Sequence, residues 1–151
     1  MPVSTDQTLT IVRNLNADPM TVYNAWMDPN QRKQWFTPSA DMMTCTNCTI
    51  DAKVGGQYRM KLVTNEGDKE YHMGGEFREL DPGNKIIFTW KSCSESDNDP
   101  AATCTVTLKP TKTGTEMTFI QVGFANDESR NDQTQGWNGC FTTLEQYVDS
   151  E

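Results

Sequence analysis

The single histidine of this 151-residue chain is the first candidate for catalysis. A Ser-His-Asp or Cys-His arrangement would have to use His72. This residue follows Tyr71 in a segment of strand-like alternation, and Gly74 and Glu76 share its face. We therefore predict that His72 lies on the outer surface in contact with solvent. The sequence predicts no catalytic residue, so a binding protein is favoured, and a cyclase- or hydrolase-type enzyme remains an alternative.

Five cysteines are the other residues with reactive side chains. Cys45 and Cys48 have the C-x-x-C spacing of a metal or redox pair. A zinc site needs two further ligands, and Cys93, Cys104 and Cys140 do not repeat the close spacing. Strand alternation also puts Cys93 and Cys104 on opposite faces, which disfavours a bridge. We predict no metal site and, because the count is odd and no secretion signal is visible, five reduced thiols.

Carboxylates within strand-like segments could perform acid–base chemistry in a dry cleft, but pairing across strands on the surface is the simpler interpretation. The candidate carboxylates are Asp51, Glu76 and Glu79, and the candidate partners are Arg13, Arg59 and Arg78. No glycine-rich phosphate loop precedes a helix, so we expect no nucleotide and no other cofactor.

The charge of the chain excludes several classes of partner. The formal net charge is -8 and the isoelectric point is about 4.6. Nucleic acids and anionic membrane surfaces attract basic patches, and no cluster of Lys and Arg is visible here. No apolar run is long enough to span a membrane, and the first residues do not form a signal peptide. We expect a cytoplasmic protein that binds neither nucleic acid nor membrane.

Hydrophobic periodicity predicts the elements that position these residues. Strand patterns cover residues 8–15, 44–51, 57–63, 70–80, 85–91, 103–109 and 116–122. Asp18 and Pro19 begin a helix that runs to about Met27, and a second short helix covers 31–35. A long helix is expected over 132–149, where apolar residues recur at spacings of three and four.

Several short motifs, in their order and spacing, resemble one family. They include Ala17-Asp18-Pro19, Ala25-Trp26-Met27-Asp28-Pro29, Trp35-Phe36-Thr37-Pro38, Val54-Gly55-Gly56, Gly75-Glu76-Phe77-Arg78-Glu79-Leu80, Phe88-Thr89-Trp90, Gly123-Phe124 and Gly136-Trp137. The chain resembles the bacterial activator-of-heat-shock-protein-90-ATPase-like proteins of the START-like (SRPBCC, Bet v-type, polyketide cyclase) superfamily. The resemblance covers nearly the whole chain.

The resemblance implies an α+β helix-grip fold with one domain over residues 1–151. In this fold a curved antiparallel sheet of six to seven strands wraps around a long C-terminal helix, and two short helices follow the first strand. Many members bind apolar molecules without catalysis, and the eukaryotic chaperone activators suggest a co-chaperone role as an alternative. Where many members carry a histidine before the Gly-Phe segment, this chain carries Gln121.

We predict that the protein, a monomer or homodimer, binds a small and largely apolar ligand between the sheet and the long helix. Gln121 would be the chief polar contact, and its buried amide should meet Arg13, a backbone group, water or the ligand. If Gln121 only filled the core, Gln121→Leu would leave stability similar or improved. Strand alternation and the helix stripe aim the expected binding residues inward; they are Tyr58, Met60, Phe88, Trp90, Val106, Leu108, Phe119, Gln121, Trp137, Phe141 and Leu144.

Overall fold

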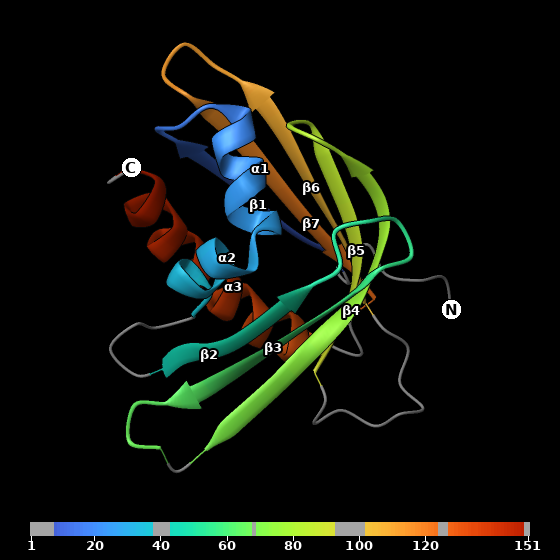
Figure 1. Ribbon diagram of the computed structural model, residues 1–151, viewed down its shortest axis with the longest axis vertical. Coiled ribbons are helices and arrows are strands. Elements are labelled where there is room, and N and C mark those ends of the chain that lie inside the picture. Colours follow the sequence, from blue (N-terminus) through green and yellow to red (C-terminus); the bar gives the residue numbers. More distant parts are fainter. Residues whose placement is uncertain (1–7, 38–42, 68, 93–101, 124–126, 150–151) are drawn as a thin grey trace.

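A sheet that curls around a long helix dominates the structure, a computed structural model that describes residues 8–37, 43–67, 69–92, 102–123 and 127–149 (Figure 1). These residues form seven strands and three helices. In chain order the elements are β1 (Thr8–Leu15), α1 (Pro19–Met27), α2 (Pro29–Trp35), β2 (Met43–Ile50), β3 (Gln57–Thr64), β4 (Glu70–Asp81), β5 (Lys85–Ser92), β6 (Ala102–Pro110), β7 (Thr115–Val122) and α3 (Asp127–Asp149).

The sheet is antiparallel at every strand pair and has the order β1-β7-β6-β5-β4-β3-β2. Its concave face holds α3, while α1 and α2 lie beside α3 and contact β6 and β2 respectively (Figure 1). This arrangement confirms the predicted helix-grip fold, including the two short helices after the first strand. The predicted strands also agree with the observed ones to within one residue at each end.

The two short helices begin at Asp-Pro pairs. The Asp18 carboxylate accepts a hydrogen bond from the Thr21 amide at 2.8 Å, and Asp28 does the same for the Asn30 amide at 2.9 Å. Proline stands at the first helical position in both cases, where its missing N–H costs nothing. The second helix therefore begins at Pro29, two residues before its predicted start.

Helix α3 begins at Asp127, five residues before the predicted start at 132. The prediction placed the start too late because the stretch from 127 to 136 contains no large apolar residue that could reveal the helical period. From there on the predicted stripe is correct, because its side chains are buried against the sheet. They are Trp137, Cys140, Phe141, Leu144 and Val148.

Trp26 of α1 occupies the centre of the core. Its ring centroid lies 5.0 Å from that of Trp35, 5.9 Å from Phe88, 6.0 Å from Phe141 and 6.4 Å from Phe119. Edge-to-face and offset contacts of this kind add to the hydrophobic stabilisation of a core. The space between the sheet and α3 is therefore filled by aromatic rings along much of its length.

Strand β4 approaches β5 very closely at Gly75. A Cβ atom at Gly75 would lie 1.9 Å from the carbonyl oxygen of Thr89, so no other residue fits there. The Glu76 amide then donates to Thr89 Oγ1 at 2.8 Å, and the register of the two strands shifts between Phe77 and Glu79. These irregularities bend the sheet around its contents.

Candidate functional site

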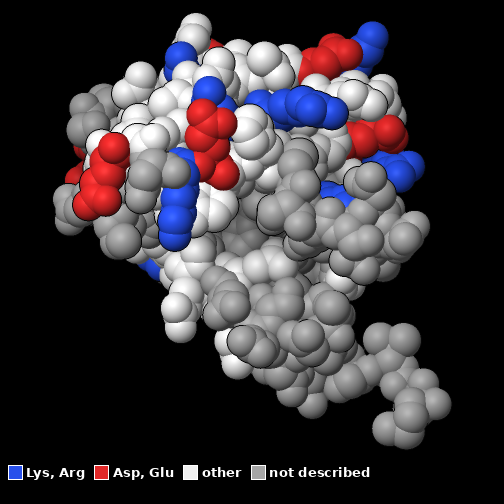
Figure 2. Space-filling view, turned by 90° about the horizontal axis from the view of Figure 1, so that it is seen from below, with Lys and Arg blue, Asp and Glu red and all other residues white. Residues whose placement is uncertain are grey.

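A groove of about 840 Å³ opens between the sheet and the first half of α3. The described residues that line it carry no formal charge. They are Phe36, Met43, Leu62, Tyr71, Met73, Trp90, Gln133, Gln135, Gly136, Trp137 and Cys140. Figure 2 looks at this end of the molecule and shows a hollow.

A chain of side-chain hydrogen bonds supplies the polar side of the groove. The indole Nε1 of Trp137 donates to Gln121 Oε1 at 2.8 Å, and Gln121 Nε2 donates to Gln133 Oε1 at 2.7 Å. Gln121 is fully buried and Gln133 is half-buried in the groove wall. The buried amide is therefore satisfied by α3, and its two partners, Gln133 and Trp137, both line the groove.

Of the residues predicted to bind a ligand, Trp90 and Trp137 line the groove. The other predicted residues point inward as expected and are buried in the core. They are Tyr58, Met60, Phe88, Val106, Leu108, Phe119, Gln121, Phe141 and Leu144. Because Trp26 packs among several of these side chains, the open space lies at one end of the interior.

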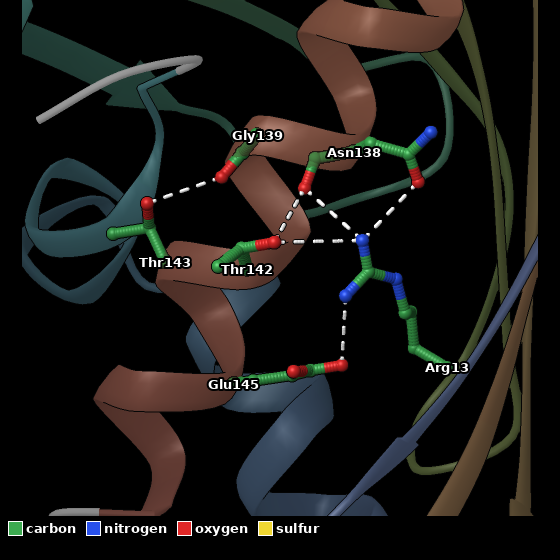
Figure 3. A network of polar contacts seen from close by, with 6 residues as sticks. All are labelled: Arg13, Asn138, Gly139, Thr142, Thr143 and Glu145. Atoms are coloured by element: carbon green, nitrogen blue, oxygen red, sulfur yellow. Dashed lines mark hydrogen bonds and ion pairs between the residues drawn. The ribbon is translucent and has the colours of Figure 1, made fainter.

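Arg13, one of the alternatives expected to partner the Gln121 amide, is not its partner, which is instead supplied by Trp137 and Gln133. Its guanidinium points to α3, where Nη1 lies 3.0 Å from Glu145 Oε1 (Figure 3). Nη2 donates to the backbone oxygen and to Oδ1 of Asn138, each at 3.2 Å. These contacts join β1, at the edge of the sheet, to α3.

Arg32 of α2 is a buried cation that the sequence interpretation did not include. Its side chain is 2% exposed, and Nη1 donates to the Trp26 carbonyl oxygen at 3.0 Å. The guanidinium carbon lies 4.6 Å from the centroid of the Trp26 ring and 4.7 Å from that of Phe36. Burial lowers the pKa of Arg32, and the nearby groups that oppose this shift are the thiols of Cys48, Cys140 and Cys45 and the phenol of Tyr58.

A bulge in β2 turns Cys45 and Cys48 to the same side of the sheet. The register shifts between Cys45 and Asn47, so that Cys45 pairs with Leu62 and Cys48 with Met60, and both partners face the core. Desolvation raises the pKa of Cys48, raises that of Cys45 to about 11 and raises that of Cys140 to about 12. These thiols are therefore protonated at neutral pH and poorly suited to nucleophilic attack.

The described part of the chain contains no group of three or more Cys, His, Asp or Glu side chains that could hold a metal ion. Cys45, Cys48, Cys104 and Cys140 are free thiols, whereas Cys93 lies outside the described residues. The predicted reduction of all five thiols stays a prediction.

His72 is exposed, as predicted, and its Nε2 lies 3.4 Å from Glu70 Oε2. The candidate carboxylates also lie at the surface. Glu76 pairs with Arg78 at 3.5 Å, whereas Asp51 and Glu79 pair with lysines at 3.7 and 3.4 Å. These carboxylates are therefore paired at the surface, but only Glu79 pairs across strands, with Lys85 of β5, and only Glu76 uses one of the predicted arginines.

Helical spacing could have identified two of the residues that the sequence interpretation missed. Arg32 lies three residues before Trp35 and four before Phe36, so it shares their face of α2. Gln133 lies four residues before Trp137 and extends the apolar stripe of α3 toward its N-terminus. The groove residues on β2, β3 and β4 gave no comparable signal, because their place at the mouth depends on how the sheet curves.

The sequence model of the family described as activator of Hsp90 ATPase homolog 1-like protein matches residues 16–149. The chain belongs to this family. Its members share the START-like helix-grip fold described above, and the predicted family resemblance is confirmed.

Solved structures of bacterial proteins share the fold. Protein CV1439 of Chromobacterium violaceum is 27% identical, with a TM-score of 0.82 over 94% of this chain and 97% of that chain. An AHSA1-like protein of Aeromonas hydrophila is 19% identical, with a TM-score of 0.81 over 95% and 92% of the two chains, and therefore supports the fold alone. No curated protein matches the chain. Among the described residues, no helix has the length and apolar character that crossing a membrane requires.

Proposed function

We propose that this protein binds a small and largely apolar ligand in the groove, without catalysing a reaction. The observation that carries the proposal is the groove of about 840 Å³ with an uncharged described lining. Small-molecule sites usually measure roughly 300–1,000 Å³ and combine apolar walls with a few polar groups. Here the aromatic rings of Phe36, Trp90 and Trp137 supply the walls, and Gln133 supplies a polar group held by Gln121.

Gly136 offers a direct test, because it lines the groove and a Cβ atom there would meet nothing within 4 Å. In Gly136→Leu the new side chain would occupy the groove. The substitution also removes a glycine from a helix interior, which usually stabilises the helix by about 1 kcal/mol. We expect binding of an apolar fluorescent probe to fall at least tenfold, while the urea unfolding midpoint stays the same or rises. Probe fluorescence and urea titration measure the two effects.

Gln146→Leu is the matched control, because Gln146 is exposed on the same helix and does not line the groove. It adds the same apolar side chain at the surface and should leave probe affinity unchanged. Equal probe affinity in wild type and Gly136→Leu would contradict the proposal. Native mass spectrometry of protein purified from cells should also detect a bound small molecule in wild type and not in Gly136→Leu.

A chaperone partner is the alternative, and the family description favours it by its reference to the Hsp90 ATPase. In that case the cytoplasmic protein would raise the ATPase rate of its cognate chaperone. We expect no change of rate at saturating concentrations of this chain. A rate increase that survives Gly136→Leu would support the chaperone role and would separate it from the groove.

A further inference from the structure

The guanidinium of Arg32 has donors that the described protein groups do not use. Nη1 donates to the Trp26 carbonyl oxygen, but Nε and Nη2 are buried and have no hydrogen-bond partner among the described residues. Nε and Nη2 stand on one edge of a guanidinium, where their N–H bonds run parallel. This is the edge that binds the two oxygens of a carboxylate in bidentate pairs.

Four aromatic rings surround the guanidinium of Arg32. The rings of Trp26, Phe36, Trp35 and Tyr58 have centroids 4.6, 4.7, 5.4 and 5.9 Å from its central carbon. Cation–π contacts of this kind offset part of the cost of burying a charge, but they do not accept the in-plane N–H bonds. A buried cation with unpaired donors is costly, which suggests that an anionic group completes the site.

The described groups near Arg32 do not supply that anion. The titratable groups close enough to interact with its charge are the thiols of Cys48, Cys140 and Cys45 and the phenol of Tyr58, and no carboxylate is among them. Burial keeps all four protonated at neutral pH. The described residues therefore leave the full negative charge at this position to a ligand.

The groove lies next to this site. Phe36, which stacks on the guanidinium, and Cys140, which is close enough to be influenced by its charge, both line the groove. Arg32 thus lies behind the wall that these two side chains form. A ligand in the groove would reach the guanidinium if the ring of Phe36 turned aside.

We propose that the groove ligand is a monocarboxylate with an apolar body, and that its carboxylate forms a bidentate pair with Nε and Nη2 of Arg32. This inference rests on the proposed function and specifies its ligand class. A carboxylate carries one negative charge and two coplanar oxygens, which match one cation and two parallel donors. A phosphate dianion would bring a second negative charge into a lining whose described residues offer no further cation.

The test compares cis-parinaric acid with its methyl ester, two fluorescent probes of nearly equal shape that differ in charge. At pH 8 we expect wild type to bind the acid at least tenfold more tightly than the ester. In Arg32→Met the affinity for the acid should fall at least tenfold, to that of the ester, while the affinity for the ester stays the same. Arg13→Met is the matched control, because Arg13 lies outside the groove and should leave the preference for the acid intact.

The outcomes separate this inference from the proposed function. If wild type binds neither probe, the groove is not a site for apolar ligands and both proposals fail. If wild type binds both probes equally, or Arg32→Met keeps the preference for the acid, the role of Arg32 is refuted and the groove remains a binding site. If Arg32→Met does not fold, the Nε–H resonance of Arg32 in ¹⁵N-labelled wild type decides: it should shift on titration with the acid and not with the ester, and an unchanged resonance would overturn the inference.

Discussion

For the substitution Gln121→Leu, the structure predicts a different effect on stability than the sequence does. The sequence alone suggests that a buried amide in an apolar core could be replaced without loss of stability. In the structure the amide joins Trp137 to Gln133 through bonds of 2.8 and 2.7 Å, and Leu could make neither. The substitution would leave the indole N–H of Trp137, which is 4% exposed, without an acceptor.

The magnitude follows from that unsatisfied donor. A buried polar group without a partner costs about 1–3 kcal/mol. Gln133 is half-buried, so water can replace its lost bond, and the apolar Leu side chain regains part of the loss through burial. We therefore expect Gln121→Leu to lower the free energy of unfolding by about 1–3 kcal/mol, which is roughly 2–4 °C in Tm per kcal/mol for a chain of this length.

The assay is urea unfolding of four proteins followed by circular dichroism: wild type, Gln121→Leu, Trp137→Phe and the double variant. Phe lacks the indole N–H, so Gln121→Leu leaves no unsatisfied donor in the double variant. The double variant should therefore lose less stability than the two single variants together, and the coupling free energy between residues 121 and 137 should be about 1 kcal/mol or more. If Gln121→Leu is as stable as wild type, or if the coupling free energy is near zero, the amide does not stabilise the protein by accepting the indole N–H of Trp137.

Two further predictions concern the contacts of α3 and the buried thiols. The side chains of the Arg13–Glu145 ion pair are 23% and 37% exposed, so solvent screens their attraction. A double-mutant cycle with Arg13→Met and Glu145→Gln should give a coupling free energy below about 1 kcal/mol that falls with added salt. A larger coupling that does not depend on salt would contradict this. Because folding raises the pKa of Cys45 to about 11 and of Cys140 to about 12 from 9.0, the folded state holds these protons more tightly than the unfolded state. Their contribution to stability should be complete below pH 9 and lost between pH 9 and 12, and iodoacetamide at pH 8 should alkylate them far more slowly in the native protein than in urea; equal rates would contradict the prediction.

Local patterns were sufficient to predict most of the secondary structure. The alternation of Leu9, Ile11 and Leu15 identified β1, and Asp18 with Pro19 identified the start of α1, because strand parity and helix capping involve only neighbouring residues. The start of α3 escaped prediction because its first residues carry no apolar period. The helix-grip topology was predicted from the resemblance of short motifs to a known family.

The position of the open space could not be predicted from the sequence. Alternation correctly turned Phe88, Phe119 and Gln121 inward, but an inward side chain fills a core or lines a groove depending on what packs against it. Trp26, which comes from a helix far along the chain from those strands, fills the middle of the interior. The groove was left at the end, where α3 meets β2, β3 and β4.

Tertiary structure also decided the chemistry at Arg32 and at the C-x-x-C pair. The sequence determined that Arg32 shares a helix face with Trp35 and Phe36, but its burial depends on Tyr58 and Cys140, which are distant along the chain. The sequence likewise determined that Cys45 and Cys48 lie in a strand. Only the bulge between them, which depends on pairing with β3, turned both thiols inward, because one extra residue reverses strand parity.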